Sequence, residues 1–333
     1  MRILAIESTC DETGAAIVEP ADAGVKVLGE ALASSAKIHI QYGGVVPEVA
    51  AREQLKTIIP VVESVLKEAQ LRPADLDALA VATGPGLVGS LLVGVETAKA
   101  LALAWQKPII SVNHLVAHIF ANWIDTANIP QFPALALVVS GGHTDLIYLH
   151  DARKWHWLGG TRDDAAGECF DKCARILGLG YPGGPALETA ALAGHQDPVV
   201  KLPRPLLHEP TLDLSFSGLK SALGQALEKD PGASRSALAA EVIQAVVDSL
   251  VVKTELALNQ VPAKSLILAG GVAANELLRQ RLSIVAKNAR VSFYTPQKRY
   301  CTDNPAMVGA AALFRPEPTA ALELTVSPNL EVV

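Results

Sequence analysis

One arrangement of strands and turns occurs twice in the sequence, and this repetition limits the possible folds more than any other feature. Alternating apolar residues predict a strand, a short turn and a second strand at residues 2–20, and the pattern returns at residues 134–152. A strand, a glycine turn and the start of an apolar helix are predicted at residues 77–94 and again at residues 264–282. The chain is therefore expected to be internally duplicated, with each half folding into α/β layers.

Duplicated halves of this kind resemble the actin, hexokinase and Hsp70 superfamily, in which two lobes with mixed sheets flanked by helices enclose a central cleft. The composition agrees with packed α/β layers, since 50% of the 333 residues are hydrophobic and 19% are charged. We expect an N-terminal lobe at residues 1–112 and a C-terminal lobe at residues 113–333, with a last helix that could return to the N-terminal lobe.

The sequence predicts a cytoplasmic protein that does not enter a membrane. Its apolar N-terminal segment is a strand and is too short for a signal sequence. The most apolar helix, residues 89–105, carries Glu96 and Lys99 in its middle, so a membrane span would bury both charges in lipid. Four cysteines in a chain of this length without a secretory signal indicate reduced thiols.

A long helix is predicted at residues 47–70, where apolar side chains recur every three or four positions and Pro47 suits the first turn. Pro60 is expected to break or kink this helix, because proline lacks an N–H group and its ring clashes with the preceding turn.

Two histidines, His114 and His118, stand four residues apart where a helix is predicted to begin. Residues i and i+4 share a helix face, so both imidazoles could bind one metal ion, although two ordinary histidines on a half-buried face would show the same spacing. A zinc protease of the H-E-x-x-H type requires glutamate directly after the first histidine, and Leu115 occupies that position.

The best candidate for a third metal ligand is Asp303, in a turn just before an apolar helix. Capping of that helix is the commoner role for an aspartate in this position. Two histidines and one carboxylate would leave coordination positions open for a substrate and would suit iron or zinc.

Two glycine-rich turns could bind an anion or a nucleotide. In "VVSGGHTDL", residues 138–146, the absent side chains of Gly141 and Gly142 let backbone N–H groups approach a phosphate, and a tight hairpin is the alternative. In "LAGGVAANELL", residues 268–278, Asn275 lies near a helix N-terminus, where it could contact a nucleotide or cap the helix.

A third turn, "ESTCDETG", gathers the carboxylates of Glu7, Asp11 and Glu12. A sugar kinase would hold metal and phosphate at such a turn, but the usual D-x-G pattern is missing here. Cys169 and Cys173 share a helix face further along, where core packing is favoured over metal binding.

The net charge of −6 argues mildly against a nucleic-acid partner, but the charge is unevenly distributed. Residues 275–299 hold six basic side chains and only one acidic side chain, Glu276, which gives a local charge of +5 (6 − 1). This segment could face phosphates or form an ordinary solvated helix face. The basic side chains are those of Arg279, Arg281, Lys287, Arg290, Lys298 and Arg299.

The order and number of the motifs, from residue 1 to about residue 310, resemble the TsaD family of bacterial tRNA adenosine threonylcarbamoyltransferases. This family once carried the label of a sialoglycoprotein endopeptidase, which the missing glutamate at Leu115 makes doubtful. The motifs are "MRILAIESTCDETGAAIVE", "TGPGLVGSLLVG", "NHLVAH", "VSGGHTDL", "GECFDKCARILGLGYPGGP", "LSFSGLKSA", "LAGGVAAN" and "YCTDNPAMVG".

The resemblance implies an enzyme that transfers a threonylcarbamoyl group from threonylcarbamoyl-adenylate to the exocyclic amine of the adenosine 3′ of the anticodon, in tRNAs reading codons that start with A. Its partners would be tRNA, a TsaB-like paralogue bound through helices of the N-terminal lobe, and a small TsaE-like ATPase. An ATP-dependent small-molecule kinase of the same fold is the alternative function.

The resemblance also implies roles for individual residues. His114, His118 and Asp303 would bind one iron or zinc ion, and Glu12, with Asp11 second, would accept the amine proton. Substrate contacts would come from two motifs and three further positions. The implied substrate-binding residues are Val138, Val139, Ser140, Gly141 and Gly142 for carbamoyl and phosphate, His143 beside them, Asp171 and Glu188 for ribose, Gly184 for the nucleoside, and Asn275 for adenine.

Overall fold

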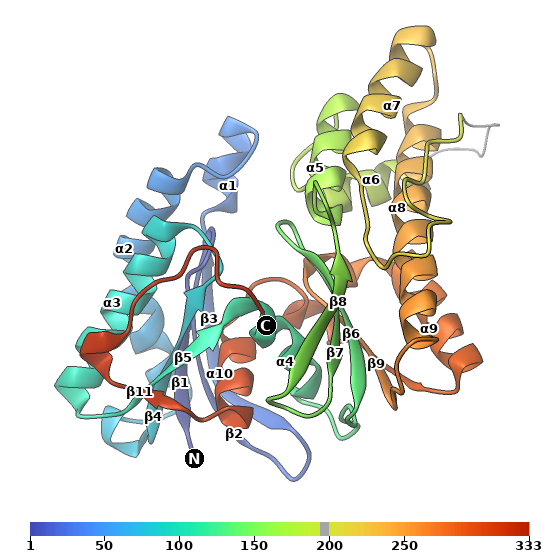
Figure 1. Ribbon diagram of the computed structural model, residues 1–333. Helices are drawn as coiled ribbons and strands as arrows, with labels where there is room; N and C mark the ends of the chain where they lie inside the picture. The colour runs from blue at the N-terminus through green and yellow to red at the C-terminus, as the bar shows by residue number, and fades with distance from the viewer. Residues whose placement is uncertain (194–199, 333) are drawn as a thin grey trace. The chain divides into compact units, whose positions relative to one another are not determined.

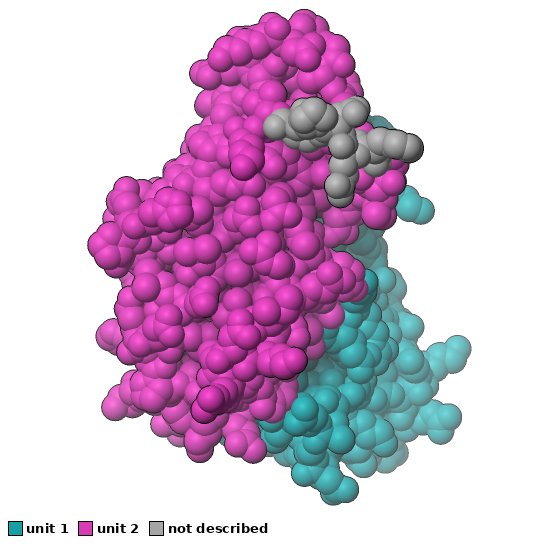
Figure 2. Space-filling model, turned by 90° about the vertical axis from the view of Figure 1, so that its right-hand side faces the viewer, with its two compact units in different colours: residues 1–130, 296–333 teal, residues 131–295 magenta. Residues whose placement is uncertain are grey.

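The computed structural model describes residues 1–193 and 200–332 (Figure 1). The chain packs as two compact units, with residues 1–130 and 296–333 in unit 1 and residues 131–295 in unit 2 (Figure 2). The division differs from the lobes expected at residues 1–112 and 113–333, because the segment with the paired histidines packs within unit 1, as does the last helix.

Unit 1 is built on a six-stranded sheet with the order β11-β5-β4-β1-β2-β3. β1 pairs antiparallel with β2 and parallel with β4, and β4 pairs parallel with β5. The carboxyl ends of β1, β4 and β5 therefore lie along one edge of the sheet. The strands are β1 (Ile3–Glu7), β2 (Glu12–Pro20), β3 (Val25–Ser34), β4 (Ala78–Gly84), β5 (Ile109–Asn113) and β11 (Pro318–Thr319).

Unit 2 repeats this arrangement in a five-stranded sheet with the order β10-β9-β6-β7-β8. β6 pairs antiparallel with β7 and parallel with β9, as β1 does with β2 and β4. The matching strand orders confirm the internal duplication and the fold class expected from the sequence. The strands are β6 (Ala134–Val139), β7 (Thr144–Leu149), β8 (Trp155–Gly160), β9 (Ser265–Ala269) and β10 (Ser292–Tyr294).

Helices cover both faces of the sheet in unit 1 (Figure 1). α2 packs on β2 and β3 and α3 on β4, while α10 packs on β1, β2 and α4. α2 continues through Pro60, so the predicted break does not occur there. The helices of unit 1 are α1 (Ala36–His39), α2 (Pro47–Glu68), α3 (Val88–Trp105), α4 (His114–Phe120) and α10 (Pro305–Phe314).

Unit 2 carries longer helices beside its sheet, with α6 packed on α5 and α8, and α9 packed on α8. α5 begins close to the glycine turn after β6, because the N–H group of Gly167 donates to the carbonyl oxygen of Ser140, and the start of α6 packs against α5 at Asp171. The helices are α5 (Ala166–Ile176), α6 (Gly183–Leu192), α7 (Ser217–Lys229), α8 (Arg235–Leu258) and α9 (Glu276–Ala289).

α3 is long and apolar enough, by length and composition alone, to cross a membrane. One of its faces packs against β4 and is buried, as expected of a core helix. The other face exposes Val88, Leu92 and Leu103, and Lys99 pairs there with Glu96 at 2.9 Å. The prediction of a core helix is therefore correct for one face of α3.

Candidate functional site

The local sequence fixes where the histidine-bearing helix begins. The side chain of Asn113, the last residue of β5, accepts hydrogen bonds from the N–H groups of Leu115 and Val116 and caps α4. His114 and His118 consequently lie one turn apart on the same face of α4, and their ring centroids are 4.7 Å apart. Both histidines are buried.

Asp303 reaches the two histidines because another residue caps α10. The side chain of Asn304 accepts the hydrogen bond from the N–H group of Met307, so the alternative role of Asp303 as the helix cap falls to Asn304 instead. The carboxylate of Asp303 lies instead 3.4 Å from Nε2 of His114 and 3.2 Å from Nε2 of His118.

His114, His118 and Asp303 form a group suited to a metal ion among the residues that the structure describes. One ligand atom from each lies within 4.8 Å of the others. Both ring nitrogens of His118 are buried; Nδ1 lacks a hydrogen-bond partner in the described chain, and Nε2 has the carboxylate of Asp303 at 3.2 Å, which is an ion-pair distance rather than a well-aligned hydrogen bond. The two imidazoles and the carboxylate therefore fit a divalent ion with open coordination positions.

The electrostatics of this group suit the same ligands. Burial opposes ionisation of Asp303, but the neighbouring imidazoles of His114 and His118 hold the pKa of its carboxyl far below the usual range. Burial lowers the pKa of His118, which keeps that imidazole neutral with a lone pair to offer. Burial also opposes a charge on His114, yet the carboxylates of Glu7 and Asp303 raise its pKa well above the usual value.

The first hairpin turn of unit 1 carries the carboxylates expected to act as a base. Burial, reinforced by the negative charges of Asp303 and Asp11, raises the pKa of Glu12 to about 9. Glu12 therefore retains its proton at neutral pH unless a nearby cation offsets these charges. The turn also touches the histidine group directly, since the hydroxyl of Thr9 lies 3.3 Å from Nδ1 of His114.

Sequence analysis did not identify the residue that fixes the backbone of this turn. Gln54 of α2 is buried, and its amide nitrogen donates to the carbonyl oxygens of Ser8, Cys10 and Glu12 at distances of 3.2, 3.1 and 2.9 Å. A lone glutamine on the buried face of an amphipathic helix was the available signal, because a buried amide must satisfy its hydrogen bonds.

In unit 2, the motif with two glycines forms an open turn between β6 and β7. The amide nitrogen of Ser140 donates to the carbonyl oxygen of His143 at 2.8 Å, and the N–H group of His143 donates to the Ser140 hydroxyl. A Cβ atom added to Gly141 or Gly142 would meet no atom within 4 Å. Val138 and Val139, which precede the turn, are buried in β6 and support it through packing.

The remaining expected substrate residues lie in two pairs within unit 2. Oδ1 of Asp171 accepts from the N–H group of Gly183 at 2.6 Å, next to Gly184, and burial raises the pKa of that carboxyl. Nδ2 of Asn275 donates to Oε1 of Glu188 at 2.5 Å, while Oδ1 of Asn275 accepts from Leu278 and caps α9. Asn275 therefore has the capping role that the sequence left open.

Two other features have structural explanations. Cys169 and Cys173 are fully buried on α5 with their sulfur atoms 4.0 Å apart, as core packing predicted. The basic segment crosses from unit 2 into unit 1, and part of its charge is paired, since Arg281 lies 3.3 Å from Asp248 and Arg299 lies 2.8 Å from Asp125.

The fold occurs in solved proteins of other kinds. Full-length HypF shares 14% identity with a TM-score of 0.61, covering 94% of this chain and 46% of that chain. Component A of the (R)-2-hydroxyglutaryl-CoA dehydratase from Acidaminococcus fermentans shares 15% identity with a TM-score of 0.56, covering 95% and 98%. Fold and site thus define a protein of the actin, hexokinase and Hsp70 class with a candidate metal centre in one of its duplicated units.

The family model of TsaD, tRNA N6-adenosine threonylcarbamoyltransferase, matches residues 26–310. A protein of that description from Moorella thermoacetica is 50% identical over 317 residues, covering 94% of this chain and 91% of the relative. Another, from Kosmotoga olearia, is 46% identical over 312 residues, covering 94% and 92%. The chain belongs to the tRNA N6-adenosine threonylcarbamoyltransferase family, and none of these matches supports the kinase alternative.

Proposed function

We propose that this protein transfers the threonylcarbamoyl group from threonylcarbamoyl-adenylate to the exocyclic amine of the adenosine 3′ of the anticodon, in tRNAs that read codons starting with A. The single observation that carries the proposal is the family match over residues 26–310, which includes the metal-ligand candidates His114, His118 and Asp303 of unit 1 and the whole of unit 2. Such a transfer needs positioning more than a protein nucleophile, because the mixed anhydride of the adenylate is already activated.

The chemistry requires one bond to form and one to break. The adenosine nitrogen attacks the carbamoyl carbon, a C–N bond forms, and the bond from that carbon to the phosphate oxygen breaks as AMP leaves. The proton of the amine passes to a carboxylate of the first hairpin, for which we propose Glu12 first and Asp11 second. In the metal-free chain the raised pKa keeps Glu12 protonated, so its action as a base would require a bound cation to offset the nearby carboxylates and favour the ionised form.

His114, His118 and Asp303 would hold one divalent ion, iron or zinc. When bound, such an ion supplies positive charge that stabilises the negative charge developing on the departing phosphate or on the carbamoyl oxygen. The three side chains orient that ion and exclude water from one side of it, since both histidines are buried.

The turn of unit 2 would bind the adenylate. The N–H groups of Gly141 and Gly142 and the hydroxyl of Ser140 would bind the carbamoyl and phosphate groups, with Val138 and Val139 behind them and His143 beside them. Asp171 and Glu188 would accept hydrogen bonds from ribose hydroxyls, Gly184 would pack beside the nucleoside, and Asn275 would contact adenine.

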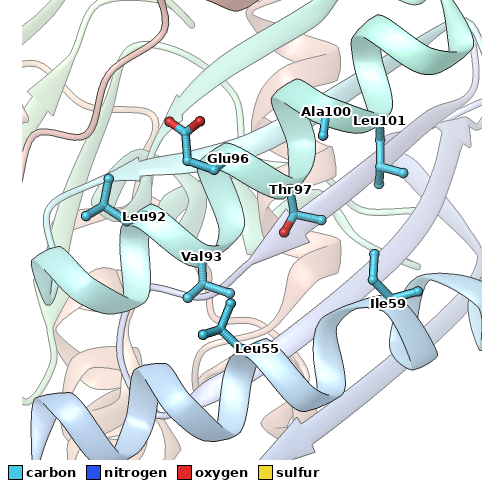
Figure 3. Close-up of a pocket in the computed structure, with 8 residues that line it drawn as sticks. All are labelled: Leu55, Ile59, Leu92, Val93, Glu96, Thr97, Ala100 and Leu101. Carbon is cyan, nitrogen blue, oxygen red and sulfur yellow. The ribbon is translucent and has the colours of Figure 1, made fainter.

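We propose the groove between α2 and α3 as the docking surface for a TsaB-like paralogue. This groove, with a volume of about 500 Å³, is lined by apolar side chains that include exposed Leu55, Ile59 and Leu92 (Figure 3). Side chains of Leu55 and Ile59 on α2 point toward those of Val93 and Thr97 on α3. An exposed apolar strip of this kind is typical of a helix-to-helix interface.

A small TsaE-like ATPase and tRNA would be the other partners, and we place the reaction in the cytoplasm, where tRNA is found. The anticodon loop is single-stranded, so presenting its adenosine would require little unpairing energy. Exposed basic residues near α9, such as Lys287 and Arg290, could contribute phosphate contacts, as the basic segment suggested.

Complementation tests the proposed function. Cells depleted of their own enzyme would receive the wild-type protein, the double variant His114→Ala with His118→Ala, or the control His156→Ala, which alters an exposed histidine on β8. Threonylcarbamoyladenosine in digested bulk tRNA is then measured by mass spectrometry. We expect the wild type and the control to restore the nucleoside. The double variant, expressed at the same level, should not restore it. No restoration by the wild type, supplied with its partners, would overturn the proposed activity, and full restoration by the double variant would make the histidines structural.

A further inference from the structure

The carboxylate of Glu7 lies directly behind one of the candidate metal ligands. Glu7 is the last residue of β1 and is completely buried, with 0% of its surface exposed. Its Oε2 atom is 3.1 Å from Nδ1 of His114, and its Oε1 atom accepts a hydrogen bond from the N–H group of Thr9 at 2.7 Å. Both carboxylate oxygens are therefore engaged, one with the backbone of the turn and one with the imidazole.

This contact determines which nitrogen of His114 keeps its hydrogen when the imidazole is neutral, as it must be to bind a metal ion. An ionised carboxylate can only accept hydrogen bonds, so Nδ1 of His114 must carry a hydrogen to bond with Glu7. The other nitrogen, Nε2, faces Asp303 at 3.4 Å and belongs to the group that fits a metal ion. In a neutral imidazole, a hydrogen on Nδ1 leaves the lone pair on Nε2, which is the atom that a metal ion would require.

The second candidate ligand has no such support. Nδ1 of His118 has no hydrogen-bond partner in the described chain, so no carboxylate there fixes its hydrogen. The Thr9 hydroxyl is the other neighbour of Nδ1 of His114, at 3.3 Å, but a hydroxyl can donate as well as accept and so does not select one tautomer. Asp303 faces Nε2, the side on which a metal ion would bind, so Glu7 is the carboxylate that holds a hydrogen on Nδ1 of His114.

We propose that Glu7 is the positioning residue of the metal centre, which holds His114 in the tautomer with a free Nε2 lone pair and thereby raises the affinity of the site for a divalent cation. The inference rests on the proposed metal site in unit 1. Carboxylates that orient a metal-binding histidine commonly change metal affinity by about 10- to 100-fold. The sequence signal was a glutamate that ends an otherwise apolar, buried strand.

Glu7→Gln separates this role from a purely structural one. The amide oxygen of glutamine can still accept from the N–H group of Thr9, so the turn keeps its hydrogen bond. The amide nitrogen then faces Nδ1 of His114 and can only donate, which favours the tautomer with its hydrogen on Nε2. The substitution thus preserves size and turn geometry while it reverses the hydrogen bond to the imidazole.

The test measures the binding of Zn²⁺ and Co²⁺ to metal-free protein by calorimetry and by competition with a chelating dye. We expect Glu7→Gln to bind either ion 10- to 100-fold more weakly than the wild type. Thr9→Val, which removes the other neighbour of Nδ1, should stay within about threefold, because Glu7 still accepts from His114. Thermal unfolding of the metal-free proteins should agree within a few degrees.

A second measurement does not depend on any variant at position 7. In the zinc-loaded wild type labelled with ¹⁵N-histidine, the imidazole of His114, assigned by comparison with His114→Ala, should show its hydrogen on Nδ1. Equal metal affinity for wild type and Glu7→Gln, or a hydrogen on Nε2 of His114, would overturn the inference. If the wild type binds no metal ion at all, the proposed metal site fails and the inference fails with it. Normal binding by wild type with no loss in Glu7→Gln refutes the inference alone.

Discussion

Gly270 lies where the turn after β9 packs closely against the backbone of β6. We predict that a single methyl group added at Gly270 forces these two strands of unit 2 apart. Gly270 directly follows β9 and has φ at +90° and ψ at 170°, a conformation that residues with a Cβ atom rarely adopt. A Cβ atom here would lie 2.3 Å from the carbonyl oxygen of Val139 and 2.7 Å from its carbonyl carbon. Backbone atoms cannot move aside as the end of a flexible side chain can, so β6 or β9 must shift.

The expected loss follows from two contributions. The backbone conformation alone disfavours alanine by about 1–3 kcal/mol. The overpacking against Val139 adds about 1–3 kcal/mol. We therefore expect Gly270→Ala to lower the free energy of unfolding of unit 2 by roughly 3 kcal/mol, which corresponds to more than 100-fold in the opening equilibrium at about 1.4 kcal/mol per factor of ten.

Hydrogen exchange followed by mass spectrometry can measure this loss within one unit. Peptides that cover β6 and β9 should exchange more than 100-fold faster in Gly270→Ala, and peptides from the sheet of unit 1 should not change. Gly224→Ala is the matched control, because Gly224 lies in α7 and a Cβ atom there meets nothing within 4 Å. The control should be stabilised by about 0.5–1 kcal/mol. Exchange in Gly270→Ala within threefold of the wild type would refute the steric argument.

Three further predictions concern charge, packing and the partner. Because the pKa of Glu12 is raised from 4.5 to about 9, the metal-free folded chain holds a proton that the unfolded chain releases, so stability should fall from pH 5 to pH 9. Glu12→Gln should reduce that fall in melting temperature, and an unchanged pH profile would contradict the shift. The Nζ atom of Lys253 donates to the carbonyl oxygens of Glu209 and Thr211, so Lys253→Met should lower the free energy of unfolding in urea by about 2 kcal/mol. An unchanged free energy of unfolding would contradict this. Leu55→Glu should abolish co-purification of a TsaB-like partner while metal binding stays normal; retained co-purification would exclude this groove.

Much of the fold could be predicted from the sequence because local periodicity encodes it. The repeated strands and turns gave the same strand order in both sheets, β3-β2-β1-β4-β5 and β8-β7-β6-β9-β10. Pro60 was the exception: a proline in a long helix forfeits one hydrogen bond, but packing of α2 on β2 and β3 keeps the helix continuous.

The candidate site could be predicted only in part, and the reason differs between residues. His114 and His118 share a helix face through local geometry alone. Asp303 can face them because Asn304 caps α10 in its place. The sequence did not show which of these two neighbouring residues would be the cap. The unit boundary after residue 130, rather than after residue 112, likewise depended on packing.

The sequence by itself determined the duplicated strand pattern, the spacing of the two histidines and the open glycine turn, because each depends on neighbours a few residues apart. Only the tertiary structure decided that Glu7 supports His114, 107 residues away, and that Asp303 completes the group. The physical reason lies in the sheet: β1, β4 and β5 run parallel, so their carboxyl ends meet at one edge, and residues that end separate strands become neighbours.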